Sequence, residues 1–125
     1  MHYGIKTLVE AIKESSGTDE AKEFLIELCD DEKIPQSTPS WLLSNLHIDL
    51  GELDEAEEVL KRLLIEHSRN KDTRLWSTMT TLVSCCHGNK GPEHAIKVLR
   101  ELSNSSEYEI AMASLQKLEK LHGQR

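Results

Sequence analysis

The sequence predicts an all-α protein, and three observations support that fold class. Leu, Glu, Lys, Ala and Ser dominate the 125 residues, while aromatic residues make up only 4%. This composition favours helices over a β-sandwich, whose strands would need Val, Ile, Thr and aromatic residues. Apolar residues also recur at helical spacing between the turns. The third observation is an internal repeat.

The repeat is centred on three alanines. Ala21, Ala56 and Ala95 are each followed by leucine at four and seven positions and preceded by leucine at thirteen positions. The alanines are 35 and then 39 residues apart, a period typical of units built from two antiparallel helices. The sequence therefore predicts one domain over 1–125, a right-handed α-solenoid of three hairpins and a C-terminal capping helix. The hairpins are expected at 3–34, 38–68 and 73–103, and the cap at 107–121.

The first hairpin is expected to begin with a helix from Tyr3 to Glu14. Its i, i+3, i+4, i+7 stripe points to the core and consists of Ile5, Leu8, Val9 and Ile12. Ser15-Ser16-Gly17 ends this helix, and Thr18 supplies an N-cap hydroxyl for the next. The second helix is expected to turn four residues inward: Ala21, Phe24, Leu25 and Leu28.

The second hairpin contains the strongest helical pattern. Ser37 or Thr38 is expected to cap its first helix, and Gly51 to close that helix in a left-handed conformation. The following helix, Leu53 to His67, has a core-facing stripe of Ala56, Val59, Leu60, Leu63 and Leu64. Its solvent-facing side is expected to hold Glu57, Glu58, Lys61, Arg62 and Glu66.

The third hairpin is expected to begin with a helix from Thr73 to His87. Its predicted core residues are Leu75, Met79, Leu82, Val83 and Cys86. A turn at 88–91 then leads to Pro92 at the first position of a helix through Leu102, since that position needs no N–H. The last helix, 107–121, is expected to cover the final repeat with Ile110, Ala111, Leu115, Leu118 and Leu121.

Charge and cysteine content limit the possible functions. The formal net charge is −7, which disfavours a phosphate backbone as partner. Three cysteines do not form a disulfide framework or a zinc-binding pattern, so a reducing compartment is expected. Neither a secretory signal nor a membrane-spanning segment is evident. We therefore expect an intracellular protein, cytoplasmic in the first instance, with no membrane partner.

The segment Gly51-Glu52-Leu53-Asp54-Glu55-Ala56 resembles the turn and second-helix start of tetratricopeptide (TPR) and pentatricopeptide (PPR) repeats. Aligned on Ala56, Leu43 falls on the large apolar site of the first helix and Ser44 on its small site. The usual proline of the second helix is absent, and Trp41 is one place from the usual tryptophan. Resemblance to TPRs implies a peptide-binding adaptor, whereas resemblance to PPRs implies an organellar RNA binder.

The first helix of each hairpin would line the inner groove of such a solenoid. The groove is expected to hold Lys6, Lys13, Trp41, Leu42, Asn45, Thr80 and Ser84, with Glu10, Asp49 and Thr81 beside them. Apolar area next to an amide suits an extended peptide. The alternative for Trp41 is that it packs between the first two hairpins and binds nothing.

These observations predict a non-catalytic protein-interaction scaffold that binds a partner peptide or helix. The alternative is a PPR-like RNA-binding segment of an organellar RNA-processing or RNA-stability protein, which would be mitochondrial. A third possibility is self-association, or stacking on further repeats, through the ends of the solenoid. Glu10 stands where a chaperone-binding TPR has asparagine, which argues against binding a C-terminal carboxylate.

No catalytic residue, cofactor or metal site is predicted. The sequence lacks a phosphate-binding loop and a nucleophile elbow. Cys85 and Cys86 are adjacent on a predicted helix and point about 100° apart, so they do not readily share one tetrahedral ion. We interpret one of these two cysteines as a buried small hydrophobe and the other as partly exposed.

Overall fold

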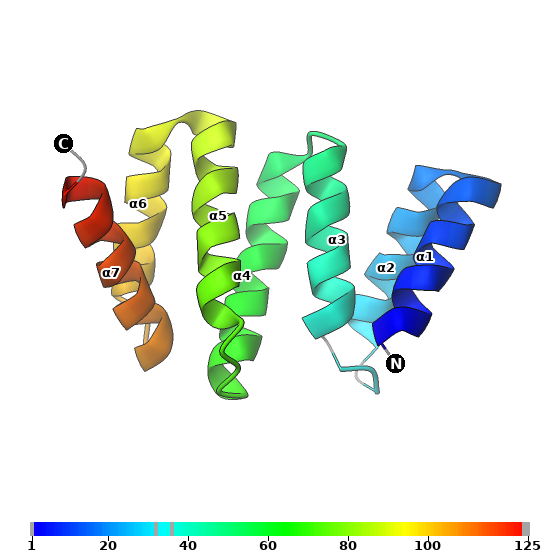
Figure 1. Cartoon of the computed structure of the whole chain (residues 1–125), viewed down its shortest axis with the longest axis horizontal. Helices are drawn as coiled ribbons and strands as arrows, with labels where there is room; N and C mark the ends of the chain where they lie inside the picture. Colours follow the sequence, from blue (N-terminus) through cyan, green and yellow to red (C-terminus); the bar gives the residue numbers. More distant parts are fainter. Residues whose placement is uncertain (1, 32, 36, 124–125) are drawn as a thin grey trace. The chain divides into compact units, whose positions relative to one another are not determined.

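The structure is a computed structural model that describes residues 2–31, 33–35 and 37–123. This part of the chain forms seven helices that pack mostly against their sequence neighbours (Figure 1). The all-α prediction is confirmed. In chain order the helices are α1 (His2–Ser16), α2 (Thr18–Asp30), α3 (Ser37–Asp49), α4 (Leu53–Arg69), α5 (Leu75–Lys90), α6 (Pro92–Ser103) and α7 (Tyr108–Gly123).

The chain divides into two compact units, which we describe separately. Unit 1 is Met1–Val59 and unit 2 is Leu60–Arg125. The boundary falls within α4, so its first part belongs to unit 1 and the remainder to unit 2.

Unit 1 is built from a helical hairpin and the helix that follows it. Helix α2 packs against both α1 and α3, and α1 also contacts α3. Its core consists of Val9, Ala21, Leu25, Leu43, Leu46 and Val59. Partly buried side chains surround that core: Ile5, Ile12, Phe24, Leu28, Cys29 and Leu42.

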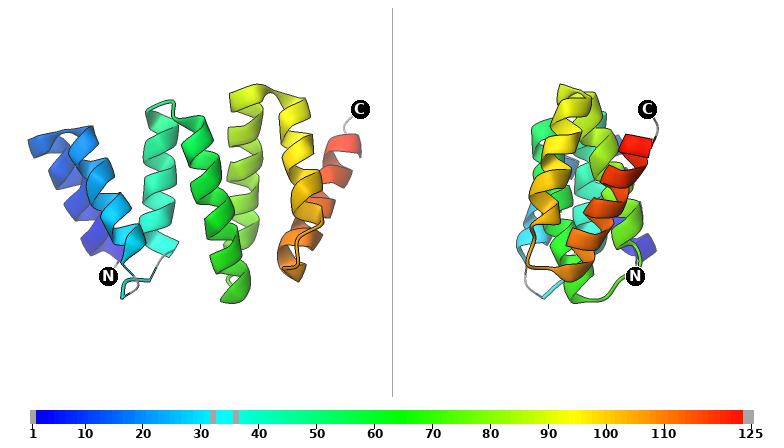
Figure 2. Two further views of the ribbon diagram at one scale, coloured as in Figure 1. Left: turned by 180° about the vertical axis from the view of Figure 1, so that it is seen from behind. Right: turned by 90° about the vertical axis from the view of Figure 1, so that its left-hand side faces the viewer.

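Unit 2 has a similar succession of helices. Helix α6 packs against both α5 and α7, and α5 contacts α7 (Figure 2). Its largest fully buried apolar side chains include Leu60, Leu63, Leu64, Met79, Leu82, Leu99 and Ile110. Polar contacts join the end of α4 to the start of α7. The Ser68 hydroxyl lies 3.3 Å from Oε2 of Glu107 and 3.1 Å from Oε2 of Glu109.

Glycines with positive φ end the first helix of each predicted hairpin. Gly17 and Gly91 directly precede α2 and α6, with φ of 97° and 92°, and Gly51 has φ of 77° between α3 and α4. A side chain rarely adopts these angles, so glycine fits all three turns. The prediction of a left-handed Gly51 is confirmed.

Burial repeats with the period of the sequence. Ala21, Ala56 and Ala95 are all buried, and so is the leucine four positions after each of them. At an offset of 39, five of the six buried residues of α3 have a buried counterpart on α5, and the sixth, Ser44, corresponds to the half-buried Val83. The buried residues of α3 are Pro39, Ser40, Leu43, Ser44, Leu46 and His47. Those of α5 are Leu75, Thr78, Met79, Leu82, Cys85 and Cys86.

Three residues lie in environments that the sequence did not predict. Leu8 and Leu115 were expected in the core, but they are 49% and 46% exposed. Both belong to terminal helices, whose outer sides no described helix covers. Glu57 was expected in solvent but is buried, because it lies on the same stripe of α4 as Leu60 and Leu64.

Some of the predicted core residues of α5, α6 and α7 are less buried than expected. Val83, Leu102, Ala111 and Leu118 are half-buried rather than buried, and the side chain of Leu121 lies outside those described. The packing face of α7 instead includes Ala113 and Ser114.

Several helix ends also differ from the predictions. Thr18 is the first residue of α2, and Gly17 takes the N-cap position without a side-chain hydrogen bond. Helix α5 begins at Leu75, two residues later than expected, and continues through Gly88 to Lys90. The predicted turn at 88–91 is therefore reduced to Gly91. Pro92 begins α6, as predicted.

Candidate functional site

The candidate groove residues of unit 1 lie on α1 and α3, which contact each other. Lys6 is exposed and Lys13 is half-buried, and Nζ of Lys13 lies 3.9 Å from Oε1 of Glu10. An exposed pair at this spacing contributes little to stability. Both lysines therefore remain available to a partner.

Trp41, Leu42 and Asn45 are half-buried on α3. Leu42 packs against the core of unit 1, so it serves the fold as well as the surface. One turn of helix separates Leu42 from Asn45, which places an amide beside apolar area. The structure thus places three of the predicted residues along one stretch of α3.

The other two predicted groove residues, Thr80 and Ser84, lie in unit 2 on α5 and are exposed. The Thr80 hydroxyl donates to the carbonyl oxygen of Trp76 at 3.1 Å, and the Thr81 hydroxyl donates to that of Ser77 at 3.1 Å. These threonine hydroxyls use their protons within the helix, so towards a partner they offer oxygen lone pairs.

Trp76 is an exposed aromatic residue that the sequence analysis did not single out. Its side chain is 44% exposed, four residues before Thr80 and eight before Ser84. Residues at this spacing share one face of a helix. The helical register could have found it, because Leu75 and Met79 define the buried stripe and Trp76 lies beside that stripe.

A polar cluster joins α2, α3 and the turn after α3. Nδ1 of His47 lies 2.8 Å from Oε1 of Glu52, and Nζ of Lys22 donates to both oxygens of that carboxylate at 3.1 and 3.2 Å. The hydrogen bond from His47, followed by that from Lys22, lowers the pKa of Glu52. The bond to Glu52 raises the pKa of Lys22. All three groups have a partner, so the cluster fastens a turn.

A buried histidine in unit 2 has the neighbours of a catalytic base. Nε2 of His67 lies 3.1 Å from Oγ1 of Thr78, and Nδ1 lies 3.4 Å from Oδ2 of Asp72. Burial lowers the pKa of His67, and the hydrogen bonds from Arg74 lower the pKa of Asp72 to about 2. A hydroxyl, an imidazole and a carboxylate in this order could activate a nucleophile.

Burial decides against that chemistry. Thr78 is 1% exposed and His67 2%, so no substrate carbonyl can approach the hydroxyl. Nδ1 of His67 has no hydrogen-bond partner among the described residues, because the 3.4 Å approach of Asp72 lacks the required geometry. We therefore assign this group to the stability of the α4–α5 connection.

The three thiols differ in accessibility. In the described part of the chain none of them forms a disulfide. Cys29 is half-buried, with its sulfur 3.7 Å from the Ser40 hydroxyl oxygen, while Cys85 and Cys86 are both buried. The expectation that one of the adjacent pair is partly exposed is wrong, because the face of α5 that packs is wide enough to include both.

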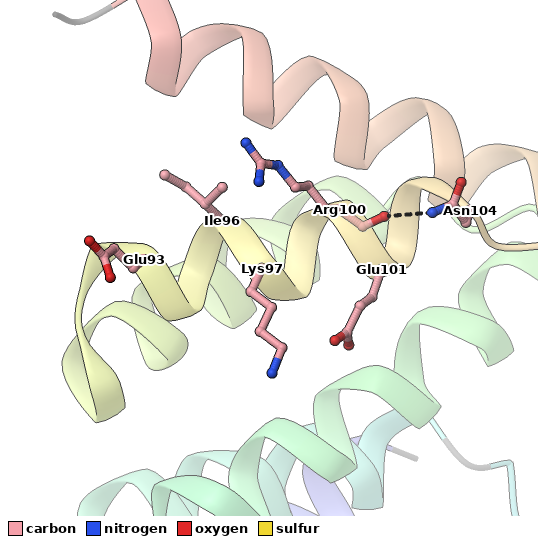
Figure 3. A pocket seen from close by; sticks show the side chains of 6 residues that line it. All are labelled: Glu93, Ile96, Lys97, Arg100, Glu101 and Asn104. Atoms are coloured by element: carbon pink, nitrogen blue, oxygen red, sulfur yellow. Dashed lines mark hydrogen bonds between the residues drawn. The ribbon is translucent and has the colours of Figure 1, made fainter.

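A shallow hollow lies along the outer face of α6 (Figure 3). Its volume is about 490 Å³, and its lining comes from α6 and the residue after it: Glu93, Ile96, Lys97, Arg100, Glu101 and Asn104. The Asn104 amide donates to the carbonyl oxygen of Arg100 at 3.2 Å. Charges of both signs border a single apolar side chain, so the hollow selects no ligand class.

Comparisons with known proteins do not assign the chain to a family. A scan against family models, a search of curated proteins and a search of solved structures each found no match. Within the described residues no helix combines the length and the apolar character needed to cross a membrane. The function of the candidate surfaces must therefore be inferred from the residues that form them.

Proposed function

We propose that the chain is a non-catalytic protein-interaction module, a short right-handed solenoid of three TPR-like hairpins and a terminal helix. It would bind a peptide or helix of a partner protein along the first helices of the hairpins. The repeated burial at offsets of 35 and 39 and the three positive-φ glycines support the repeat arrangement. The way α3 packs on both α1 and α2 supports stacking of successive hairpins.

The observation that carries the proposal is the exposed indole of Trp76. Tryptophan is among the residues that most often dominate binding energy, because it has a large apolar area and one donor. Trp76 is 44% exposed on the face of α5 that also carries Thr80 and Ser84. Trp41, Leu42 and Asn45 give α3 in unit 1 a related composition. Aromatic and apolar area beside small polar groups suits peptide binding.

RNA binding in the manner of PPR proteins is the second candidate, and one local observation favours it. Residues 60–125 hold eleven lysines and arginines and seven acidic residues, a net charge of +4, whereas the whole chain carries −7. Unit 2 taken alone would attract a phosphate backbone. We rank this candidate second because Thr80 and Thr81 direct their hydroxyl protons to the backbone.

The test is capture of binding partners from cell lysate with the purified protein and with Trp76→Ala. Ile65→Ala is the matched control, because Ile65 is similarly exposed at 37% but lies on the second helix α4. Circular dichroism would first show that both variants fold. We expect the wild-type protein to capture one discrete partner protein, and nuclease treatment should not abolish this capture. Ile65→Ala should still capture the partner, whereas Trp76→Ala should not.

Two results would contradict the proposal. Equal recovery of the protein with Trp76→Ala and Ile65→Ala would remove the indole from the binding surface. Recovery of RNA whose binding falls steeply with salt would favour the PPR-like alternative.

A further inference from the structure

The buried imidazole of His67 in unit 2 has one nitrogen with a partner and one without. Nε2 lies 3.1 Å from Oγ1 of Thr78 on α5, whereas Nδ1 makes no hydrogen bond within the described part of the chain. The ring is 2% exposed. A buried polar atom without a partner is uncommon and is often a sign of stored strain or of function. Nδ1 is therefore a candidate position for a proton.

The backbone holds a carboxylate beside that atom. Lys71 has a φ of 53°, and the amide of Asp72 donates to the carbonyl oxygen of His67 at 2.8 Å. A left-handed residue followed by such a bond is a common way to end a helix, and here it ends α4. Oδ2 of Asp72 lies 3.4 Å from Nδ1 of His67 as a result. Only the carboxylate has to turn for these two atoms to bond.

The carboxylate is bound to Arg74 instead. The Arg74 guanidinium donates to Oδ2 of Asp72 from Nε at 3.0 Å and from Nη2 at 2.6 Å. The side chain of Arg74 is 55% exposed. An ion pair with one partner in solvent stabilises a fold only weakly, because water competes for both charges. Oδ2 of Asp72 thus lies between an exposed cation and a buried imidazole.

Charged groups from the neighbouring elements set the pH at which the ring takes a proton. Burial is the main influence and lowers the pKa of His67, and Arg74 lowers it further. Asp72 and Glu66 raise it. Thr78, the α5 residue that contacts the ring, is uncharged. The acidic residues that α7 directs to this end of α4 bond to the Ser68 hydroxyl: Glu107 and Glu109.

We propose that protonation of His67 moves Asp72 from Arg74 to the imidazole, which makes the α4–α5 connection a local pH switch. A proton from solvent binds the ring, and both ring nitrogens are then donors. Nε2 keeps Thr78 as its acceptor, and Nδ1 donates to Oδ2 of Asp72. A buried cation without an acceptor costs far more free energy than a broken exposed ion pair, so the carboxylate follows the ring.

Asp72 is ionised wherever an imidazole titrates, because the bonds from Arg74 lower its pKa to about 2. Its movement reaches the first turn of α5. The amide of Arg74 donates to Oδ1 of Asp72 at 3.0 Å, and the amide of Leu75 donates to its carbonyl oxygen at 3.1 Å. The switch therefore acts on the backbone that directly precedes the exposed Trp76.

An NMR titration of the full chain from about pH 7.5 to about pH 4 tests the switch. The ring nitrogens of His67, identified by comparison with His67→Gln, report its protonation. The Nε–H signal of Arg74 reports its bond to Asp72. We expect both signals to change with one midpoint, while circular dichroism at the same pH values shows that the chain stays folded.

Two variants that each remove one positive charge distinguish exchange of partners from a general effect of charge. Arg74→Gln removes the competitor for Asp72, so the midpoint of His67 should rise by about one pH unit, a tenfold gain in proton affinity. Arg69→Gln is the matched control. Arg69 is also exposed and ion-paired, but its partner is Glu107 at 3.4 Å. This variant should move the midpoint by less than about 0.3 pH units.

Three results would overturn the proposal. In the first, the Arg74 signal stays constant while His67 titrates, so the ring is charged without taking the carboxylate. In the second, His67 stays neutral until circular dichroism shows unfolding. In the third, Arg74→Gln and Arg69→Gln shift the midpoint equally. If either variant fails to fold, the titration of the wild-type protein decides between the switch and the first two results.

Discussion

Replacing Leu43 with alanine, and separately Leu8 with alanine, tests the packing argument at two equivalent positions. The leucines are 35 residues apart and occupy the same place in successive hairpins. Leu43 is 2% exposed and belongs to the core of unit 1, while Leu8 is 49% exposed. The two substitutions remove the same atoms, so any difference between them reports what covers each side chain.

The expected magnitudes differ several-fold. Leu43→Ala removes buried methyl groups and leaves a cavity, which costs about 2–5 kcal/mol. Leu8→Ala removes a half-exposed side chain and leaves no cavity. At roughly 0.8 kcal/mol per buried carbon group, half-burial of three such groups amounts to about 1 kcal/mol.

Urea unfolding followed by circular dichroism would measure both values at low protein concentration. With a urea dependence of about 1–3 kcal/mol per molar, Leu43→Ala should lower the midpoint by about 1–3 M. Leu8→Ala should lower it by less than about 1 M. Equal midpoints for the two variants would refute the reasoning, because Leu8 would then be covered in solution as Leu43 is.

Three further predictions concern pH, one turn and one ion pair. The free energy of unfolding falls below pH 6.5, because unfolded His67 takes up a proton that burial keeps off the folded ring. A second loss follows between pH 3.8 and about 2, where Asp72 is protonated only in the unfolded chain. Urea unfolding midpoints measured across this pH range check both losses of stability. If the midpoint of His67→Gln falls below pH 6.5 as steeply as that of the wild type, the prediction for His67 is contradicted. Gly91→Ala should lower the free energy of unfolding by about 1–3 kcal/mol through backbone strain alone, because Gly91 has a positive φ. Gly88→Ala lies within α5 and should stabilise the protein slightly, and thermal melts of the two variants compare these effects. Glu52→Gln lowers stability more at low salt than at high salt, and a salt-independent loss in urea titrations would contradict the ion pair.

The repeat alanines made the helical hairpins predictable from the sequence. Ala21, Ala56 and Ala95 are all buried. A small residue followed by leucines at helical spacing is a local pattern, so it can be recognised without knowledge of distant contacts. The glycine turns followed from the same kind of local rule.

Whether another helix covers an apolar side chain could not be predicted in this way. Helical spacing places Leu115 on an apolar stripe, but only tertiary structure shows whether another helix lies over it. Trp76 is the contrasting case, because helical register places it beside the buried stripe of Leu75 and Met79 and could have indicated its exposure. The contact between His67 and Thr78 was missed because the two residues are eleven apart on different helices, and no spacing rule connects them.

The positions of the three thiols give each unit its own chemical reporter. Cys29 belongs to unit 1, whereas the buried Cys85 and Cys86 belong to unit 2. A thiol-modifying reagent reaches a buried cysteine only when the surrounding helices open. The rate of alkylation at Cys85 and Cys86 therefore measures the local opening of unit 2, while the half-buried Cys29 reports the accessibility of its site in unit 1. Mass spectrometry of the labelled peptides can then follow the two units independently, without an introduced probe.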